Sequence, residues 1–139
     1  MDSNVLLDIM TEDPRWFSWS AAAIERAADR LRLVINPIVY AEVSVRYSKI
    51  EELEIALPRE MFDREPIPYE AAFLAGKCFV LYRQQGGSKR SPLPDFFIGA
   101  HAAVAGYQLM TRDMVRYRSY FPSLALIAPE YPPGSRTRS

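Results

Sequence analysis

Leu33-Val34-Ile35-Asn36-Pro37 is the stretch that decides the fold class, because a strand pattern passes there directly into a helix start. The three apolar residues, two of them β-branched, are typical of a short buried strand. Asn36 and Pro37 form a favourable N-cap and first-turn pair, which predicts a helix to about Tyr47.

The same alternation of short apolar runs and helical patterns extends along the chain. Further helices are predicted over residues 20–31, 49–57, 68–83 and 95–106, and further strands over residues 107–111 and 124–128. The helix that begins at Asp95 carries no other charged residue, which is typical of a central, buried helix. Short strands that alternate with helices indicate an α/β fold with a mainly parallel sheet.

The composition fits one ordinary globular domain. The chain has 139 residues, 49% hydrophobic and 24% charged, which is enough for a core without disulfides or structural metal. With 17 basic and 17 acidic residues the net charge is zero, which argues against nucleic-acid binding by bulk charge alone. One cysteine and one histidine exclude an internal disulfide and the usual zinc site. We expect one domain over residues 1–131, a disordered tail over 132–139, no membrane segment or signal peptide, and a cytoplasmic location.

Four acidic residues stand where the carboxyl ends of the predicted strands should be. Asp2 opens the chain, Glu42 lies in the second turn of the helix after the first strand, Asp95 starts the apolar helix, and Asp113 follows a later strand. Ligands of parallel α/β sheets bind at that edge. Clustered carboxylates suit Mg²⁺ or Mn²⁺, ions that activate water and stabilise charge during phosphodiester hydrolysis.

Each of these acids, taken singly, also has a purely structural interpretation. Asp95 and Asp113 lie near helix starts, where an acid caps the first turn or interacts favourably with the helix dipole. Glu42 could be a solvated helix residue, and Asp2 a flexible terminal acid. The joint pattern, rather than any one residue, favours a metal site.

Four motifs in this order resemble the PIN-domain family, and within it the VapC-like toxins. Asp2-Ser3-Asn4-Val5-Leu6-Leu7-Asp8 is similar to the family's opening Asp-Thr/Ser-Asn-Val-Leu, and Asn36-Pro37-Ile38-Val39-Tyr40-Ala41-Glu42 is similar to its second motif. Leu93-Pro94-Asp95-Phe96-Phe97-Ile98-Gly99-Ala100-His101-Ala102 is similar to the third motif, and Leu109-Met110-Thr111-Arg112-Asp113 to the fourth. The resemblance covers residues 2–128, and it is the four motifs together that make it specific.

The resemblance implies a PIN-like three-layer α/β fold, in which helices flank a central, mainly parallel sheet. The catalytic residues and metal ligands that it implies are Asp2, Glu42, Asp95 and Asp113. Asn4 and Thr111 would support them. It further implies Mg²⁺ or Mn²⁺ as the cofactor, endoribonuclease activity on RNA, a homodimer, and a cognate VapB-like antitoxin that blocks the site.

The chain departs from the family pattern before the first aspartate. The family has several apolar residues there, which form a central strand, whereas only Met1 precedes Asp2 in this sequence. Because a metal ligand needs rigid support, we expect the natural protein to carry roughly three to six more residues, mostly apolar, before Asp2.

Basic residues flank the third and fourth motifs. Lys89 and Arg90 precede the third motif, and Arg112 and Arg116 flank Asp113. We expect these four residues to form a rim that binds RNA phosphates, which would reconcile zero net charge with a polyanionic substrate. A solvated charged surface is the alternative.

Four further residues have a structural and a functional interpretation. His101 could act as a general base, but metal-bound water needs no histidine, so we interpret it as structural. Cys78 lies on an apolar helix stripe and is expected in the core. Trp16 and Trp19 are expected to be packing anchors or dimer contacts, with stacking on RNA bases as the alternative.

The sequence therefore predicts a metal-dependent endoribonuclease that is the toxin of a toxin–antitoxin pair. Two alternatives stay open. One is a catalytically silent PIN scaffold that binds a partner or RNA, and the other is a PIN nuclease that acts outside toxin–antitoxin systems.

Overall fold

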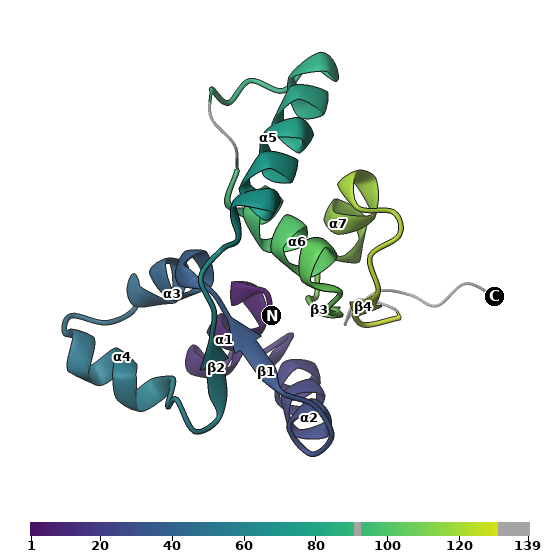
Figure 1. Ribbon diagram of the computed structural model, residues 1–139. Coiled ribbons are helices and arrows are strands. Elements are labelled where there is room, and N and C mark those ends of the chain that lie inside the picture. The colour runs from purple at the N-terminus through teal and green to yellow at the C-terminus, as the bar shows by residue number, and fades with distance from the viewer. Residues whose placement is uncertain (91–92, 131–139) are drawn as a thin grey trace.

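The computed structural model describes residues 1–90 and 93–130, in which helices alternate with short strands (Figure 1). The elements in chain order are α1 (Ser3–Met10), α2 (Phe17–Ala28), β1 (Leu33–Ile35), α3 (Pro37–Ser44), α4 (Ile50–Ala56), β2 (Phe62–Arg64), α5 (Tyr69–Gln84), α6 (Pro94–Ala105), β3 (Leu109–Met110), α7 (Met114–Tyr120) and β4 (Leu126–Ile127). The predicted tail over 132–139 lies outside the described residues. In the part that is described, no helix has the length and apolar character needed to span a membrane.

The predicted passage from strand to helix over residues 33–37 is confirmed. β1 covers the predicted residues, and the Asn36 side chain accepts a hydrogen bond of 3.0 Å from the backbone amide of Val39, so it caps α3. This cap turns the chain sharply after β1. As a result, α3 carries Glu42 back over the end of the strand.

The strands form two separate parallel pairs. β1 pairs with β2, with Val34 opposite Asp63, and β3 pairs with β4, with Met110 opposite Ile127. The α/β class and the parallel pairing agree with the prediction. The described residues therefore contain two separate halves of a sheet, β1 with β2 and β3 with β4, rather than one continuous sheet.

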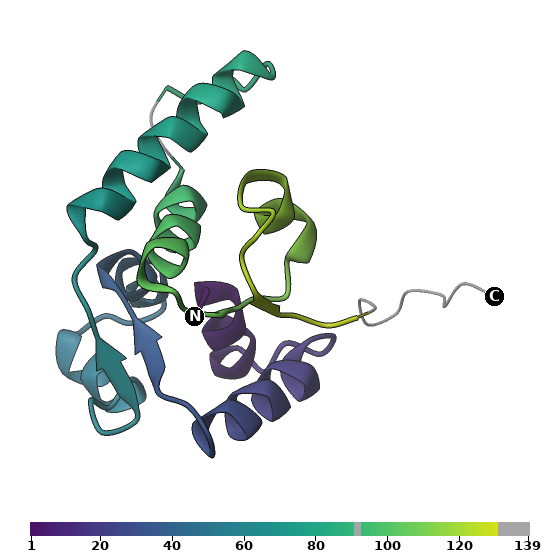
Figure 2. The ribbon, with the colours of Figure 1, turned by 45° about the vertical axis from the view of Figure 1, so that its right-hand side comes forward.

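The first two residues lie between these halves (Figure 2). The amino group of Met1 donates to the carbonyl of Val34 in β1 at 3.2 Å, and the next amide, that of Asp2, donates to the carbonyl of Met110 in β3 at 2.9 Å. Consecutive amides that point to opposite sides are the pattern of a strand paired with two neighbours. Asp2 is thereby held at the place where the two halves meet.

A groove of about 460 Å³ continues from Met1 between the two halves, and its lining includes residues of β1, β3, α2 and α6. Successive residues of a strand direct their backbone groups to opposite sides. Ile35 in β1 bonds to Glu65 just after β2, and Leu109 in β3 bonds to Ala125 just before β4. The neighbouring residues Val34 and Met110 therefore direct their backbone groups toward the groove. The carbonyls of Val34 and Met110 accept from Met1 and Asp2, and their amides face the groove.

α6 is the central helix, as its uncharged sequence predicts. It buries Phe96, Ile98, Gly99, Ala100, His101 and Ala102 and packs along α5, which projects away from the sheets (Figure 2). α6 ends at Gly106, whose φ of 74° is a left-handed conformation that glycine adopts without strain. Its N-terminal turn places Asp95 beside the carboxyl ends of the strands.

Candidate active site

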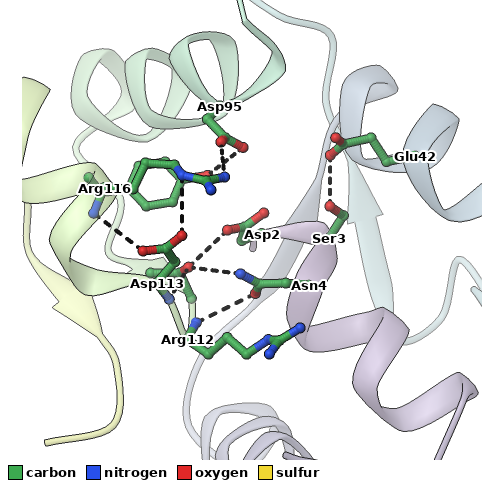
Figure 3. A network of polar contacts seen from close by, with 10 residues as sticks. Asp2, Ser3, Asn4, Glu42, Asp95, Arg112, Asp113 and Arg116 are labelled. Carbon is green, nitrogen blue, oxygen red and sulfur yellow. Dashed lines mark hydrogen bonds and ion pairs between the residues drawn. The ribbon is translucent and has the colours of Figure 1, made fainter. Parts of the chain in front are cut away.

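The four predicted acids come from four parts of the fold, and their side chains are drawn around one region in Figure 3. Asp2 precedes α1, Glu42 lies on α3, Asp95 is in the first turn of α6, and Asp113 is the N-cap of α7. Residues distant in sequence are thus neighbours in space, as the resemblance implied.

Asp2 is buried, with 4% of its surface exposed, and its carboxylate accepts a hydrogen bond of 2.8 Å from Thr111 Oγ1. The same Thr111 oxygen accepts hydrogen bonds from the amide of Asp113 at 3.0 Å and from Asn4 Nδ2 at 3.4 Å. Burial raises the pKa of Asp2, the Thr111 bond opposes this, and the nearby charge of Asp95 adds to it. The structure therefore places Asn4 and Thr111 where supports of Asp2 were expected.

Glu42 is held by a residue that the sequence analysis did not single out. Ser3 Oγ donates a 2.7 Å hydrogen bond to Glu42 Oε1, which links the start of α1 to α3. Burial raises the pKa of Glu42, Ser3 opposes the rise, and the charges of Asp95 and Asp2 contribute to it. Ser3 lies inside the opening motif, so only its place between two expected site residues could have marked it.

Asp95 and Asp113 are joined by Arg116. The Arg116 guanidinium donates from its NH1 group to Asp95 Oδ2, and its Nε lies 3.2 Å from Asp113 Oδ2 (Figure 3). Asp113 also caps α7, because its Oδ1 accepts a 3.3 Å hydrogen bond from the Arg116 amide. The structural interpretation of Asp113 as a helix cap is therefore confirmed, and its role as a metal ligand stays a prediction.

Tyr117 closes the inner side of the site. It is almost fully buried, and its hydroxyl donates a 3.4 Å hydrogen bond to Asp95 Oδ1. Burial and the charges of Asp2 and Asp95 raise the pKa of Tyr117, so the hydroxyl keeps its proton and remains a donor to these carboxylates. Tyr117 on α7, which lies outside the predicted motifs, thus helps to position Asp95.

The donor set suits a hard divalent cation, although within residues 1–90 and 93–130 no three metal-binding side chains meet closely enough to hold one as they stand. Carboxylate oxygens are the ligands that Mg²⁺ and Mn²⁺ prefer. Arg116 now supplies the positive charge between Asp95 and Asp113. The residues therefore fit such an ion on the condition that Arg116 swings away.

Arg112 is held firmly beside the acids. Its amide donates to Asn4 Oδ1 at 3.5 Å, and its Nε lies 3.3 Å from Asp8 Oδ2, at ion-pair distance but outside hydrogen-bond geometry. The guanidinium lies over the Trp16 ring, 5.1 Å from the centroid. Asp8 is itself buried and accepts a 2.8 Å bond from Ser20 Oγ.

The other two residues of the expected rim lie on the loop after α5. The amide of Lys89 donates to the Tyr82 hydroxyl at 3.3 Å, and its carbonyl accepts from Arg83 at 3.0 Å, so this residue contacts the far end of α5. Among the described contacts of the rim residues, Arg116 pairs with two of the four acids, the Arg112 side chain pairs with Asp8, and Lys89 contacts α5.

His101, Trp16 and Cys78 are buried, in line with their structural interpretations. His101 Nδ1 pairs with Asn36 Nδ2 at 3.1 Å, and because the Asn36 oxygen already accepts from Val39, the nitrogen must be the donor. Burial lowers the pKa of His101, which stays neutral with its Nε2 directed at Glu65. This histidine therefore links α6 to the end of β1 and lies apart from the four acids.

Comparisons with known proteins agree with this fold. The profile of the PIN domain matches residues 1–118, and the chain belongs to the PIN domain family. The fold is similar to that of a chain in the crystal structure of VapBC2 from Rickettsia felis bound to a DNA fragment from their promoter, with 19% identity and a TM-score of 0.69 over 93% of this chain and 96% of that chain. It is also similar to a chain of VapBC-1 from nontypeable Haemophilus influenzae, with 21% identity and a TM-score of 0.67 over 91% of this chain and 94% of that chain. No curated protein matches the sequence.

Proposed function

We propose that the protein is a metal-dependent endoribonuclease and the toxin of a toxin–antitoxin pair. The observation that carries this proposal is that a PIN fold brings Asp2, Glu42, Asp95 and Asp113 into one region, where Arg116 bridges two of them. All four carboxylates belong to buried or half-buried residues, and Asp2 and Glu42 each accept a hydrogen bond from a side-chain hydroxyl. Placing charged groups in such positions is costly, and a cation that binds among them offsets the cost.

The protein's own residues would position the ligands and the substrate. Thr111 and Asn4 hold Asp2, Ser3 holds Glu42, and Tyr117 directs its hydroxyl at Asp95. A bound Mg²⁺ or Mn²⁺ supplies an activated water and stabilises charge on the phosphodiester. Supporting contacts of this kind keep ligand geometry within the narrow range that catalysis needs.

The rim of Lys89, Arg90, Arg112 and Arg116 is proposed to bind phosphates on either side of the site. Arg116 supports this best, because its guanidinium contacts Asp95 and Asp113, whereas Asp8 and the Trp16 ring hold the Arg112 guanidinium at the neighbouring surface. Local cations of this kind let a chain of zero net charge bind a polyanion.

A VapB-like antitoxin is proposed as the partner, with the toxin as a homodimer in the cytoplasm. The two similar chains were solved in structures named VapBC, which favours such a pairing. The position of Arg116 adds a physical argument, because a guanidinium already fits between Asp95 and Asp113. An arginine or lysine of the antitoxin would block the site by the same contacts.

Cleavage of total cellular RNA with and without Mn²⁺ tests the proposal. We expect fragmentation with Mn²⁺ and none in excess EDTA, and Asp95→Asn should abolish it. Asp63→Asn, which changes an exposed acid on β2, is the matched control. RNA that stays intact under all conditions would favour the silent scaffold, and cleavage of single-stranded DNA alone would favour a different nuclease.

A further inference from the structure

An open cleft of about 430 Å³ adjoins the candidate active site. Glu42, Asp95 and Arg116 contribute to its lining, so the cleft is continuous with the four-carboxylate region. The rest of the lining is largely apolar and aromatic, with Tyr82 from α5 and Tyr120 from the end of α7. A ligand in this cleft would touch charged groups on one side and aromatic rings on the other.

Phe96 organises the aromatic side of the cleft. This residue is buried, with 2% of its surface exposed, and it directly follows Asp95. Tyr120 packs edge-to-face on the Phe96 ring with centroids 4.9 Å apart, and Tyr82 does so at 5.9 Å. The two tyrosine rings, both half-buried, are therefore held by a rigid core residue rather than by a loop.

The hydroxyls of both tyrosines are already engaged. Tyr120 donates to Gln85 Oε1 at 3.5 Å, and Tyr82 accepts from the amide of Lys89 at 3.3 Å. Tyr120 thus offers a ligand its ring surface, and Tyr82 offers a ring together with the proton of its hydroxyl. Ring surface beside a phosphate-binding site suits a flat, aromatic ligand that is joined to a phosphate.

We propose that this cleft binds one nucleobase of single-stranded RNA, the base next to the phosphate that is cleaved. The proposal rests on the proposed nuclease function and names the part of the substrate that the site recognises. Nucleobases stack on tyrosine rings with little dependence on sequence, whereas in a duplex they are already stacked on each other. Arg116, at the junction of the two sides, lies where the phosphate that joins this base to the next would pass.

The test is binding of a fluorescent eight-nucleotide single-stranded RNA to the Asp113→Asn protein, followed by anisotropy. In a series of such RNAs, one abasic site is moved along the strand. We expect about ten-fold weaker binding when the abasic site falls at the position that the cleft reads, and Tyr120→Leu should remove this sensitivity. Leucine keeps apolar bulk against Phe96 and lacks an aromatic face, so it separates stacking from packing.

Two controls accompany the series. Tyr120→Phe should behave like the parent protein, because it keeps the ring and loses only the hydroxyl. Tyr69→Ala removes a tyrosine of α5 that is 91% exposed and does not line the cleft, and it should change nothing.

The outcomes separate this proposal from the one on which it rests. If RNA is bound and cleaved but every abasic position behaves alike, or if Tyr120→Leu keeps the positional sensitivity, the nucleobase site is wrong and the nuclease stands. If the same positional effect appears with single-stranded DNA and not with RNA, the cleft is a nucleobase site and RNA is the wrong substrate. If neither nucleic acid is bound, both proposals fail.

Discussion

The guanidinium of Arg116 donates to the carboxylate of Asp95, which lies on another helix and 21 residues earlier in the chain. The same guanidinium reaches Asp113, so one side chain neutralises two of the four candidate ligands. A cation from the protein itself stands where a divalent ion would have to enter. A divalent ion bound by these two acids would therefore have to displace Arg116.

Replacing Arg116 by glutamine should tighten Mn²⁺ binding. The side chain of Arg116 is 57% exposed, so its ion pairs are weak, and we expect an increase in affinity of about two- to five-fold. Isothermal titration calorimetry measures this without any RNA. Arg118→Gln on the same helix is the control, and unchanged or weaker Mn²⁺ binding by Arg116→Gln would contradict the competition.

Replacing Asp2 by asparagine should raise the melting temperature of the metal-free protein. Burial raises the pKa of Asp2, so this group contributes stability that is complete below its unfolded pKa and is lost as the pH rises through its folded pKa. At pH 7.5 the parent protein therefore carries a buried charge that asparagine lacks. We expect a gain of a few degrees at pH 7.5, which shrinks near pH 4, measured in EDTA by calorimetry. An equal or lower melting temperature at pH 7.5 would show that Asp2 is well accommodated as a charge.

Asp8 should act on RNA binding only through Arg112. Asp8→Asn keeps the size of the side chain and removes the charge that holds the Arg112 guanidinium. We expect weaker RNA binding in Asp8→Asn, and almost no further loss when Arg112→Ala is added, since residues that act as one unit are not additive. Losses that add in the double variant would mean that Asp8 and Arg112 act independently.

The two pairs of basic residues in the rim should contribute differently to RNA binding. Arg112→Ala with Arg116→Ala should lower the salt dependence of RNA binding by roughly 0.7 for each phosphate that is no longer bound. We expect a smaller effect from Lys89→Ala with Arg90→Ala, because the backbone of Lys89 is bonded to the C-terminal end of α5, whereas Arg116 contacts two of the acids directly. Affinity across a salt series, in the Asp113→Asn protein, measures both. If neither pair changes affinity or slope, the rim is only a solvated surface.

An apolar extension before Met1 should stabilise the fold. The groove between the two sheet halves presents the backbone groups of Val34 and Met110, and the amino group of Met1 lies at its mouth. About four residues of alternating β-branched and aromatic type would pair with both edges in the parallel direction. We expect a higher melting temperature and slower exchange of the Val34 and Met110 amide protons. A glycine–serine extension of equal length is the control, and the same result from both would rule out strand pairing.

Local signals predicted much of the fold. β1 and the cap at Asn36 follow from β-branched residues and a cap–proline pair, whose effects extend over only a few residues. β2 was missed because Asp63 and Arg64 fill two of its three positions, so no apolar run marks it. α2 begins earlier than predicted, because Asp13 accepts from the amides of Arg15 and Trp16 and turns the chain into Phe17.

The sequence was enough to name the four acids of the candidate site, but it did not predict the contacts that these acids make. The acids follow from motif order, which is written in the sequence. The bond from Ser3 to Glu42 depends on how α1 packs against α3, and the position of Arg116 depends on where a long, exposed side chain comes to rest. Tertiary packing determines both contacts, and the hydrophobic periodicity of the sequence carries no information about it.

The candidate ligands are spread from Asp2 to Asp113, so a chain still on the ribosome lacks the set until Asp113 has been made. Asp2 in particular is held in place by Thr111, which is 109 residues later in the chain. Nascent and truncated chains are thus expected to be inert toward the RNA that surrounds them. If the protein is a toxin, the time between the start of synthesis and the arrival of Thr111 and Asp113 is time in which an inhibitor made earlier can already be present.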